Sequence, residues 1–212
     1  MSKTCVIVMG NADDAVPMDE AADFIGADRG AFFLAQKGFP FHYAVGDFDS
    51  VSETEMAVVQ KFARHVIRLN PIKARTDAQA AVELALEKGY TTIHMFGASG
   101  GRLDHELVNL RLCYHYPGIV YLHDAQNKIF ASETNVRFQK ENEKRYLSFF
   151  TFEEACISLR GFRYPLVRRS LTALDLYTVS NELCAEEGEL LIHAGRVLVV
   201  TSDDRKKSAH AG

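Results

Sequence analysis

The sequence lacks several features that identify common classes of protein. Its cysteines form no CxxC pair and have no zinc-like spacing to histidine; they are Cys5, Cys113, Cys156 and Cys184. Its N-terminus has no basic region followed by a long apolar stretch, as a signal peptide requires, and no apolar run approaches the length of a membrane span. We therefore expect a cytoplasmic protein with no membrane partner.

An excess of positive charge is also missing. The formal net charge is −4 and the isoelectric point is about 6.1, so a nucleic-acid partner has no electrostatic support. The arginines between 160 and 169 and the basic run at 205–207 are too short to change this conclusion. We expect no nucleic-acid partner, and we interpret the first group as a solvated face or a local anion site.

The chain has no Gly-Lys-Ser or Gly-Lys-Thr sequence after a glycine-rich loop, which excludes an ordinary P-loop protein. Its composition is otherwise that of a globular protein: 212 residues, of which 47% are hydrophobic and 25% charged. This length suffices for one large domain or two small ones with a substantial core. Cys5 and Cys113 lie in apolar runs and are expected to be buried.

Strand and helix patterns alternate through the first part of the chain, which predicts a mostly parallel α/β sheet. Capping-box pairs at Ser52/Glu55 and Thr76/Gln79 mark two helix starts, the second helix ending at Gly89. A later helix carries Leu103, Leu107, Leu110 and Tyr114 on one face. The expected strands are 4–9, 24–27, 43–45, 65–69, 92–96 and 119–122, and the first helix is 30–37.

The pattern changes after about residue 125, where short β-rich segments separated by turns replace the helices. These segments are 128–131, 136–138, 146–151, 155–159, 190–193 and 197–201. They predict an antiparallel β-sandwich or barrel. The expected fold is thus an N-terminal three-layer α/β/α domain at 1–125 and a C-terminal antiparallel β-sandwich domain at 126–212.

The segment Gly46-Asp47-Phe48-Asp49-Ser50 is the most informative in the chain. If the backbone is extended, Asp47 and Asp49 lie on one side and Phe48 on the other. Two carboxylates that close repel each other unless a cation lies between them, and oxygen ligands suit Mg²⁺. Since glycine, aspartate and serine all favour turns, a plain surface turn is the alternative.

Other polar groups follow the expected strands, and ligands of parallel α/β sheets bind at the carboxyl ends of strands. Gly100 and Gly101 precede a helix, where backbone N–H groups approach phosphate, and the Arg102 fork suits phosphate oxygens. Each group also has a structural alternative: Thr76 as a helix cap, Asp77 and Asp104 as first-turn acids, and His105 as a capping or core-edge side chain. The candidates are Asp28, Asp47, Asp49, Thr76, Asp77, Gly100, Gly101, Arg102, Asp104 and His105.

Taken in order, the motifs resemble those of the thiamin pyrophosphokinase family. The resemblance rests on Asp28-Arg29-Gly30, the acidic segment 46–50, Thr76-Asp77 and the segment 100–105, followed by 159–166 and 179–183 in the C-terminal part. It spans nearly the whole chain. It implies a catalytic α/β domain that binds ATP and Mg²⁺, a thiamin-binding β-sandwich, and a homodimer with sites at the subunit interface.

The resemblance also implies the reaction and the residue roles. A pyrophosphoryl group passes from ATP to the hydroxyl of thiamin, giving AMP and thiamin diphosphate. Asp47, Asp49, Asp77 and Asp104 would hold Mg²⁺, with Arg102 on the ATP phosphates. Asp28, Lys73, Thr76, Gly100, Gly101 and His105 would complete the ATP–Mg²⁺ site, with Lys73 offsetting phosphate charge, and Ser180 and Asn181 would face thiamin.

The chain departs from the family pattern at three places. Ala74 replaces an acidic residue, Gln79 replaces a second one, and Pro40-Phe41 stands where proline and aspartate are common. Two other functions are therefore considered. A Mg²⁺-dependent phosphohydrolase or glycosyl hydrolase explains Asp47 and Asp49 but leaves the later motifs unexplained, and a nucleotide or thiamin sensor without catalysis is favoured only by Ala74.

Overall fold

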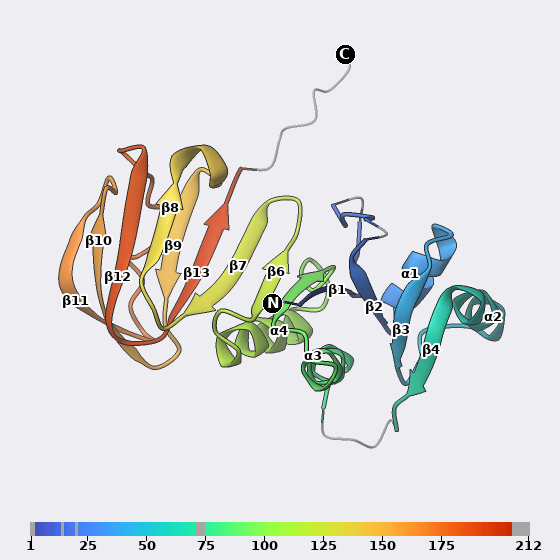
Figure 1. Ribbon diagram of the computed structural model, residues 1–212. Coiled ribbons are helices and arrows are strands. Elements are labelled where there is room, and N and C mark those ends of the chain that lie inside the picture. The colour runs from blue at the N-terminus through green and yellow to red at the C-terminus, as the bar shows by residue number, and fades with distance from the viewer. Residues whose placement is uncertain (1–2, 14, 20, 71–74, 205–212) are drawn as a thin grey trace, which may run out of the picture. The chain divides into compact units, whose positions relative to one another are not determined.

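The computed structural model describes residues 3–13, 15–19, 21–70 and 75–204 (Figure 1). Its backbone contacts divide the chain into two compact units, Met1–Asp124 and Ala125–Gly212. The first unit holds the helices and a parallel sheet, and the second is built from antiparallel strands.

Six parallel strands form the sheet of the first unit, in the order β4-β3-β2-β1-β5-β6. Because β1 pairs with both β2 and β5, the chain reverses its direction of sheet growth beside β1. The strands are β1 (Thr4–Val8), β2 (Asp23–Ala27), β3 (Phe41–Gly46), β4 (Ala63–Arg68), β5 (Thr92–Phe96) and β6 (Val120–His123).

Helices cover both faces of this sheet. Val6, Phe24 and Ala44 pack in one core cluster with the helices α1 (Arg29–Gln36) and α2 (Glu53–Phe62). The alternate strand residues Ile7, Ile25 and Val45 are also buried, and α3 (Asp77–Glu87) packs on the same strands. The helix α4 (Leu103–His115) packs on β6 and α3. The predicted three-layer arrangement is confirmed.

The second unit contains two antiparallel sheets, of orders β7-β13-β9 and β11-β10-β12-β8. Phe149 in β9 meets Phe138 in β8 at 6.3 Å between ring centroids, and Phe162 at 5.5 Å. These buried rings join the two sheets into the predicted sandwich. The strands are β7 (Asn127–Ser132), β8 (Val136–Gln139), β9 (Tyr146–Phe150), β10 (Glu154–Arg160), β11 (Leu166–Thr172), β12 (Glu187–Gly195) and β13 (Val197–Ser202), with a 3₁₀ turn η1 at Lys140–Asn142.

Several sequence expectations differ from the structure. The strand β11 was not predicted, because this edge strand exposes Arg168 and Arg169 instead of alternating polar and apolar residues. Leu103 and Leu107 of α4 are 68% and 50% exposed, and the helix instead buries Asn109, Leu112, Cys113 and Tyr114.

The two helix starts are only partly as expected. Ser52 and Glu55 form the predicted reciprocal capping box, which is confirmed. At α3, Thr76 accepts a hydrogen bond from the backbone N–H of Gln79, but the Gln79 amide donates to Glu83 instead of returning to the cap. Cys5 and Cys113 are fully buried, as expected, and burial raises the pKa of the Cys5 thiol to about 12. Among the described helices, none has the length and apolar character needed to span a bilayer.

Candidate functional site

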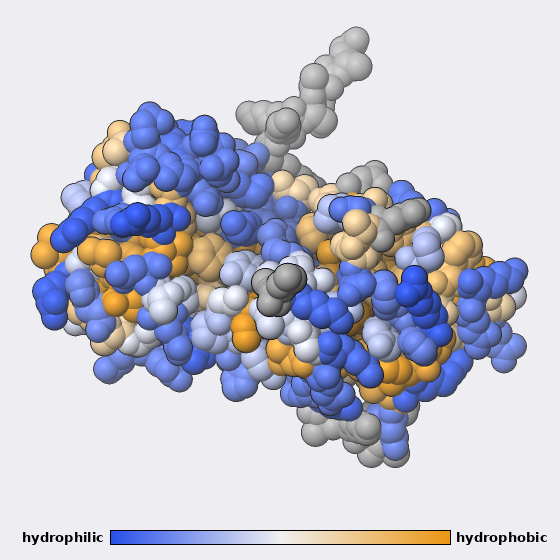
Figure 2. All heavy atoms as spheres, in the orientation of Figure 1, coloured by the Kyte–Doolittle hydropathy of each residue, from blue (hydrophilic) through white to orange (hydrophobic). Residues whose placement is uncertain are grey.

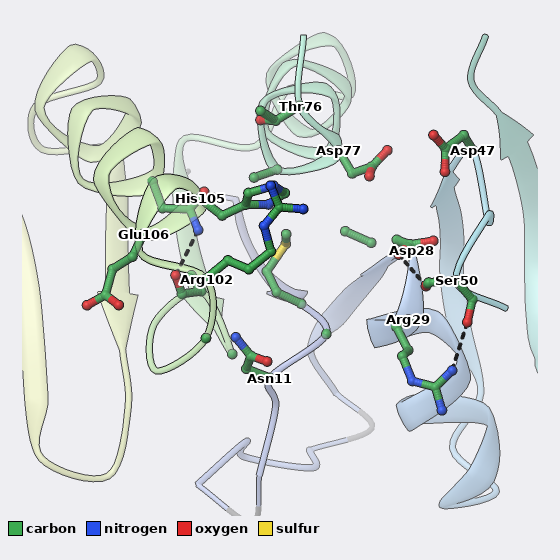
Figure 3. A pocket seen from close by; sticks show the side chains of 18 of the residues that line it. Asn11, Asp28, Arg29, Asp47, Ser50, Thr76, Asp77, Arg102, His105 and Glu106 are labelled. Atoms are coloured by element: carbon green, nitrogen blue, oxygen red, sulfur yellow. Dashed lines mark hydrogen bonds between the residues drawn. The ribbon is translucent and has the colours of Figure 1, made fainter. Parts of the chain in front are cut away.

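A pocket of about 490 Å³ opens at the carboxyl ends of the parallel strands (Figure 3). Segments that follow five of the six strands contribute to it, as expected where a parallel sheet reverses its strand order. Its lining residues are Met9, Gly10, Asn11, Ala27, Asp28, Arg29, Asp47, Asp49, Ser50, Thr76, Asp77, Ala78, Gly97, Ala98, Gly101, Arg102, His105, Glu106 and Asn109. A smaller hollow beside it is shared by Asp47, Thr76, Asp77 and His105.

The acidic segment after β3 is a turn that still brings its two carboxylates together. Phe48 has a φ of 59°, so the backbone here is not extended, as the alternation of side chains expected from the sequence requires. The Phe48 ring is buried in the core. The Asp49 backbone N–H donates to Oδ1 of Asp47 at 3.1 Å, which folds the turn. The buried ring thus fixes the segment while both carboxylates point away from the core.

Asp28 joins these two acids. Carboxylate oxygens of Asp28, Asp47 and Asp49 all lie within 4.8 Å of one another. Asp28 Oδ2 accepts a hydrogen bond of 2.6 Å from the Ser50 hydroxyl. Its Oδ1 is one of two buried side-chain polar atoms, among the described residues, that find no hydrogen-bond partner.

The backbone of Asp28 is strained as well. Its φ of 47° and ψ of −120° lie outside the favoured regions for a residue with a side chain. Such strain costs about 1–3 kcal/mol and is found mostly where function requires a particular geometry. The unpaired oxygen, the strain and the three converging carboxylates all fit a hard divalent cation with oxygen ligands.

Asp77, the first residue of α3, faces the same cluster. Burial, and after it the negative charges of Asp28 and Asp47, raise the pKa of its carboxyl to about 6, although a hydrogen bond from the Asp47 backbone opposes the shift. In Figure 3 its carboxylate lies between Thr76 and Asp47. A cation at the cluster would remove the repulsion that raises this pKa.

The opposite wall of the pocket comes from the glycine-rich turn and the start of α4. A side chain at Gly97 would meet the backbone of Ala12 at 2.3 Å, and one at Gly101 would meet the Asn11 amide at 2.1 Å. Glycine is therefore required at Gly97, where the clash is with backbone and φ is 70°, whereas at Gly101 the Asn11 side chain would have to move. Arg102 and His105 project from this wall across from Asp28 and Asp47 (Figure 3).

Asp104 does not join the acid cluster. Its carboxylate accepts two hydrogen bonds from the Arg102 guanidinium, at 3.2 and 2.6 Å, and its side chain is 63% exposed. Arg102 lowers the pKa of this carboxyl through that hydrogen bond. Neither Asp104 nor Gly100 lines the pocket, and Lys73, like Ala74, lies outside the described residues.

Ser180 and Asn181 lie in the second unit and differ in exposure. Ser180 is exposed and has a φ of 54°. Asn181 is 5% exposed, and its side chain accepts from the backbone N–H of Tyr164 and of Glu182 and donates to the Tyr164 carbonyl. Three of the hydrogen bonds open to this amide are therefore made inside the unit.

Several lining residues were not predicted as site residues: Asn11 lies outside the motifs, and Arg29 and Ser50 lie in the motifs 28–30 and 46–50 but were given no role. Asn11 follows β1 at its carboxyl end, the same placement that singled out the other candidates. Its amide donates to the Ser99 carbonyl at 3.4 Å, linking the two loops. Asn109 was not predicted, because a polar residue is unexpected on the buried face of α4. Its amide donates to the Ala98 carbonyl at 2.7 Å.

Comparison with known families gives two matches that together span most of the chain. The model described as "Thiamin pyrophosphokinase, catalytic domain" matches residues 17–144. The model described as "Thiamin pyrophosphokinase, vitamin B1 binding domain" matches residues 133–196.

Individual relatives agree with these matches. The thiamine pyrophosphokinase of Bacillus subtilis (strain 168) is 34% identical, covering 95% of this chain and all of the relative. A crystal structure of the Bacillus subtilis protein has a TM-score of 0.84 at 33% identity, covering 96% of this chain and all of that one. A family protein from Enterococcus faecalis has the same TM-score and coverage at 30% identity. The enzyme from Candida albicans, at 15% identity and a TM-score of 0.78 over 95% of this chain and 89% of its own, shares the fold.

Proposed function

The chain belongs to the thiamin pyrophosphokinase family, and we propose how its residues transfer a pyrophosphoryl group from ATP to the hydroxyl of thiamin. The observation that carries the proposal is the acid cluster at the strand ends, with the unpaired Oδ1 of Asp28 inside it. ATP as co-substrate also supports a cytoplasmic location.

We propose that Asp28, Asp47 and Asp49 hold Mg²⁺, with Asp77 beside them. This set exchanges Asp104, expected from the sequence, for Asp28, because Asp104 is engaged by Arg102 and lies outside the pocket lining. Bound there, the cation would offset the negative charge of the ATP phosphates.

Pyrophosphoryl transfer needs little covalent chemistry from the protein; the protein mainly aligns the reacting groups. Arg102 donates to Asp104 from Nε and one terminal nitrogen, and its remaining N–H groups would contact phosphate oxygens. The turn at Gly97–Gly101 allows close approach of the nucleotide, and Thr76 and His105 also line the pocket that would hold it. An aspartate of the cluster accepts the proton of the thiamin hydroxyl as it attacks the β-phosphorus in line, and AMP leaves.

The direct test of the activity is a turnover assay. The purified protein, given thiamin, ATP and Mg²⁺, is expected to form AMP and thiamin diphosphate in equal amounts, measured by chromatography of both products. Release of ADP or free phosphate would favour the hydrolase, and tight binding without products would favour the sensor. The family matches do not favour either alternative.

For thiamin, we propose that exposed Ser180 makes direct contact and that Asn181 acts by holding Tyr164 in place. Ser180 follows a segment with unusual exposure of apolar side chains, among them Leu174 at 88% and Leu176 at 84%. Val167 on the neighbouring edge strand β11 is 85% exposed. Figure 2 shows apolar surface gathered on the β10–β11 side of this unit.

Exposed apolar patches of this kind mark interaction sites. We propose that a second copy of the chain covers this one, giving a homodimer whose thiamin pocket is completed by the partner. Replacing both Leu174 and Leu176 by Asp is expected to shift the mass in solution from that of a dimer to 23.7 kDa, because burial of these charges is costly. Light scattering after size exclusion measures the mass.

The double variant should also raise the KM for thiamin more than the KM for ATP. A control, Met18→Asp, changes an exposed apolar residue of the first unit and should leave the mass unchanged. A native protein that is monomeric at the concentrations of the assay, and fully active, would contradict the dimer proposal.

A further inference from the structure

Arg29, the first residue of α1, makes contacts that its family resemblance does not explain. Its guanidinium donates to the backbone carbonyl of Ser50 at 2.8 Å and to Oε1 of Glu55 at 3.2 Å. It also lies 5.6 Å from the ring centroid of Phe32 on the same helix. One side chain thus connects the start of α1 with the loop that carries Asp47 and Asp49.

Ser50 is held from two directions. Its hydroxyl donates to Asp28, and its carbonyl accepts from Arg29, which directly follows Asp28 in the sequence (Figure 3). The acidic loop is therefore fastened to the dipeptide at the start of α1, and one member of that dipeptide is itself in the acid cluster.

Glu55 extends this attachment to α2. Its Oε2 accepts from the backbone N–H of Ser52 at 2.9 Å and from the Ser52 hydroxyl at 3.0 Å, which completes the helix cap. Its other oxygen meets Arg29. Both ends of the segment from Ser50 to Glu55 are therefore bound by the same guanidinium.

Without such a restraint, three carboxylates within 4.8 Å of one another would separate by repulsion. A planar guanidinium suits the task because it donates in fixed directions to two acceptors at once, which an ammonium group does less well. Outer residues that orient metal ligands typically change metal affinity by about 10–100-fold when they are replaced.

We propose that Arg29 is a positioning residue for the metal site: by holding the Ser50 carbonyl and Glu55, it keeps Asp47 and Asp49 within reach of a cation at Asp28. This inference rests on the metal site of the proposed function. It assigns Arg29 no contact with substrate.

The test is titration calorimetry of the full chain with Mg²⁺ alone. Arg29→Met is expected to weaken Mg²⁺ binding about ten-fold, and Arg29→Lys nearly as much, because the lysine keeps the charge but loses the fork. If the Arg29→Met variant does not fold, the Arg29→Lys variant alone tests whether Mg²⁺ affinity falls. Glu55→Gln keeps a capping acceptor and should weaken binding less.

The matched control is Arg137→Met, which removes the arginine of another exposed pair, Arg137 with Glu189 at 3.1 Å, in the second unit. It should leave Mg²⁺ affinity unchanged. Unchanged affinity in folded Arg29 variants, or a raised KM for ATP with normal Mg²⁺ binding, would overturn the inference and indicate a direct phosphate contact. If the native protein itself bound no Mg²⁺, the metal site of the proposed function would fail instead.

Discussion

Asp47→Asn and Asp49→Asn variants are expected to lose at least about 1,000-fold in kcat/KM, roughly 4 kcal/mol of transition-state stabilisation. Each change removes one negative charge from the acid cluster while keeping the size of the side chain. Asparagine at 47 also retains the Oδ1 that accepts the Asp49 N–H, so the turn should persist. Initial rates of AMP and thiamin diphosphate formation, measured over a range of thiamin concentrations at saturating ATP and Mg²⁺, give kcat/KM and so measure the loss.

Two further measurements separate chemistry from folding. The circular dichroism spectrum of both variants should match that of the native chain, because Phe48, not the carboxylates, anchors the loop in the core. Glu141→Gln, a charge change in the 3₁₀ turn of the second unit, should retain full turnover. Near-normal AMP production by a folded Asp47 or Asp49 variant would defeat the assignment of the metal site.

The parallel sheet and its helices were predictable because their signals are local. Apolar runs such as 4–8 and the Ser52/Glu55 cap each point to one structure independently of distant contacts. The strand β11 was not predictable in this way, since its position at a sheet edge leaves both faces of Arg168–Arg169 open to solvent. The exposed face of α4 was predicted to be buried, because leucines with the spacing of Leu103 and Leu107 normally lie on the buried face of a helix.

The composition of the site was partly predictable for a similar reason. Strand ends of a parallel sheet meet at one edge, so residues such as Asp28 and Asp77 converge although 49 positions apart. Which acids face one another depends on side-chain direction: Asp104 turns to Arg102, and Asp28 turns to the cluster. The contacts of Arg29 with Ser50 and Glu55 join residues 21 and 26 positions away and leave no sequence pattern.

Asp77→Asn is expected to make the protein more stable as well as inactive. The folded pKa of this carboxyl is about 6, above the value of about 4 that an unfolded aspartate has. Between about pH 4 and pH 6 the folded state therefore binds a proton at Asp77 more readily than the unfolded state does. The stability associated with that proton is fully present below about pH 4 and is lost as the pH rises through about 6.

At pH 7.5 the ionised carboxylate thus destabilises the native fold in the absence of a divalent cation. A two-unit shift corresponds to about 3 kcal/mol, and the half-buried position of Asp77 reduces this to about 1–2 kcal/mol through solvent screening. The asparagine variant should melt a few degrees higher at pH 7.5 without Mg²⁺. The difference should shrink at pH 5, and it should also shrink when Mg²⁺ is added, since the cation offsets the repulsion between the Asp77 carboxylate and the cluster.

Glu53→Gln is the matched control, because Glu53 is the first residue of α2 as Asp77 is of α3, but it is exposed and away from the pocket lining. An acid at a helix start normally stabilises the helix by about 0.3–1 kcal/mol, so this variant should melt slightly lower. Opposite signs for two acids in the same helical position would show that the acid cluster, and not the helix, sets the cost at Asp77. A lower melting temperature for Asp77→Asn at pH 7.5 without Mg²⁺ would mean that the carboxylate is stabilised by the fold itself, and the cation would then not be needed to balance the cluster.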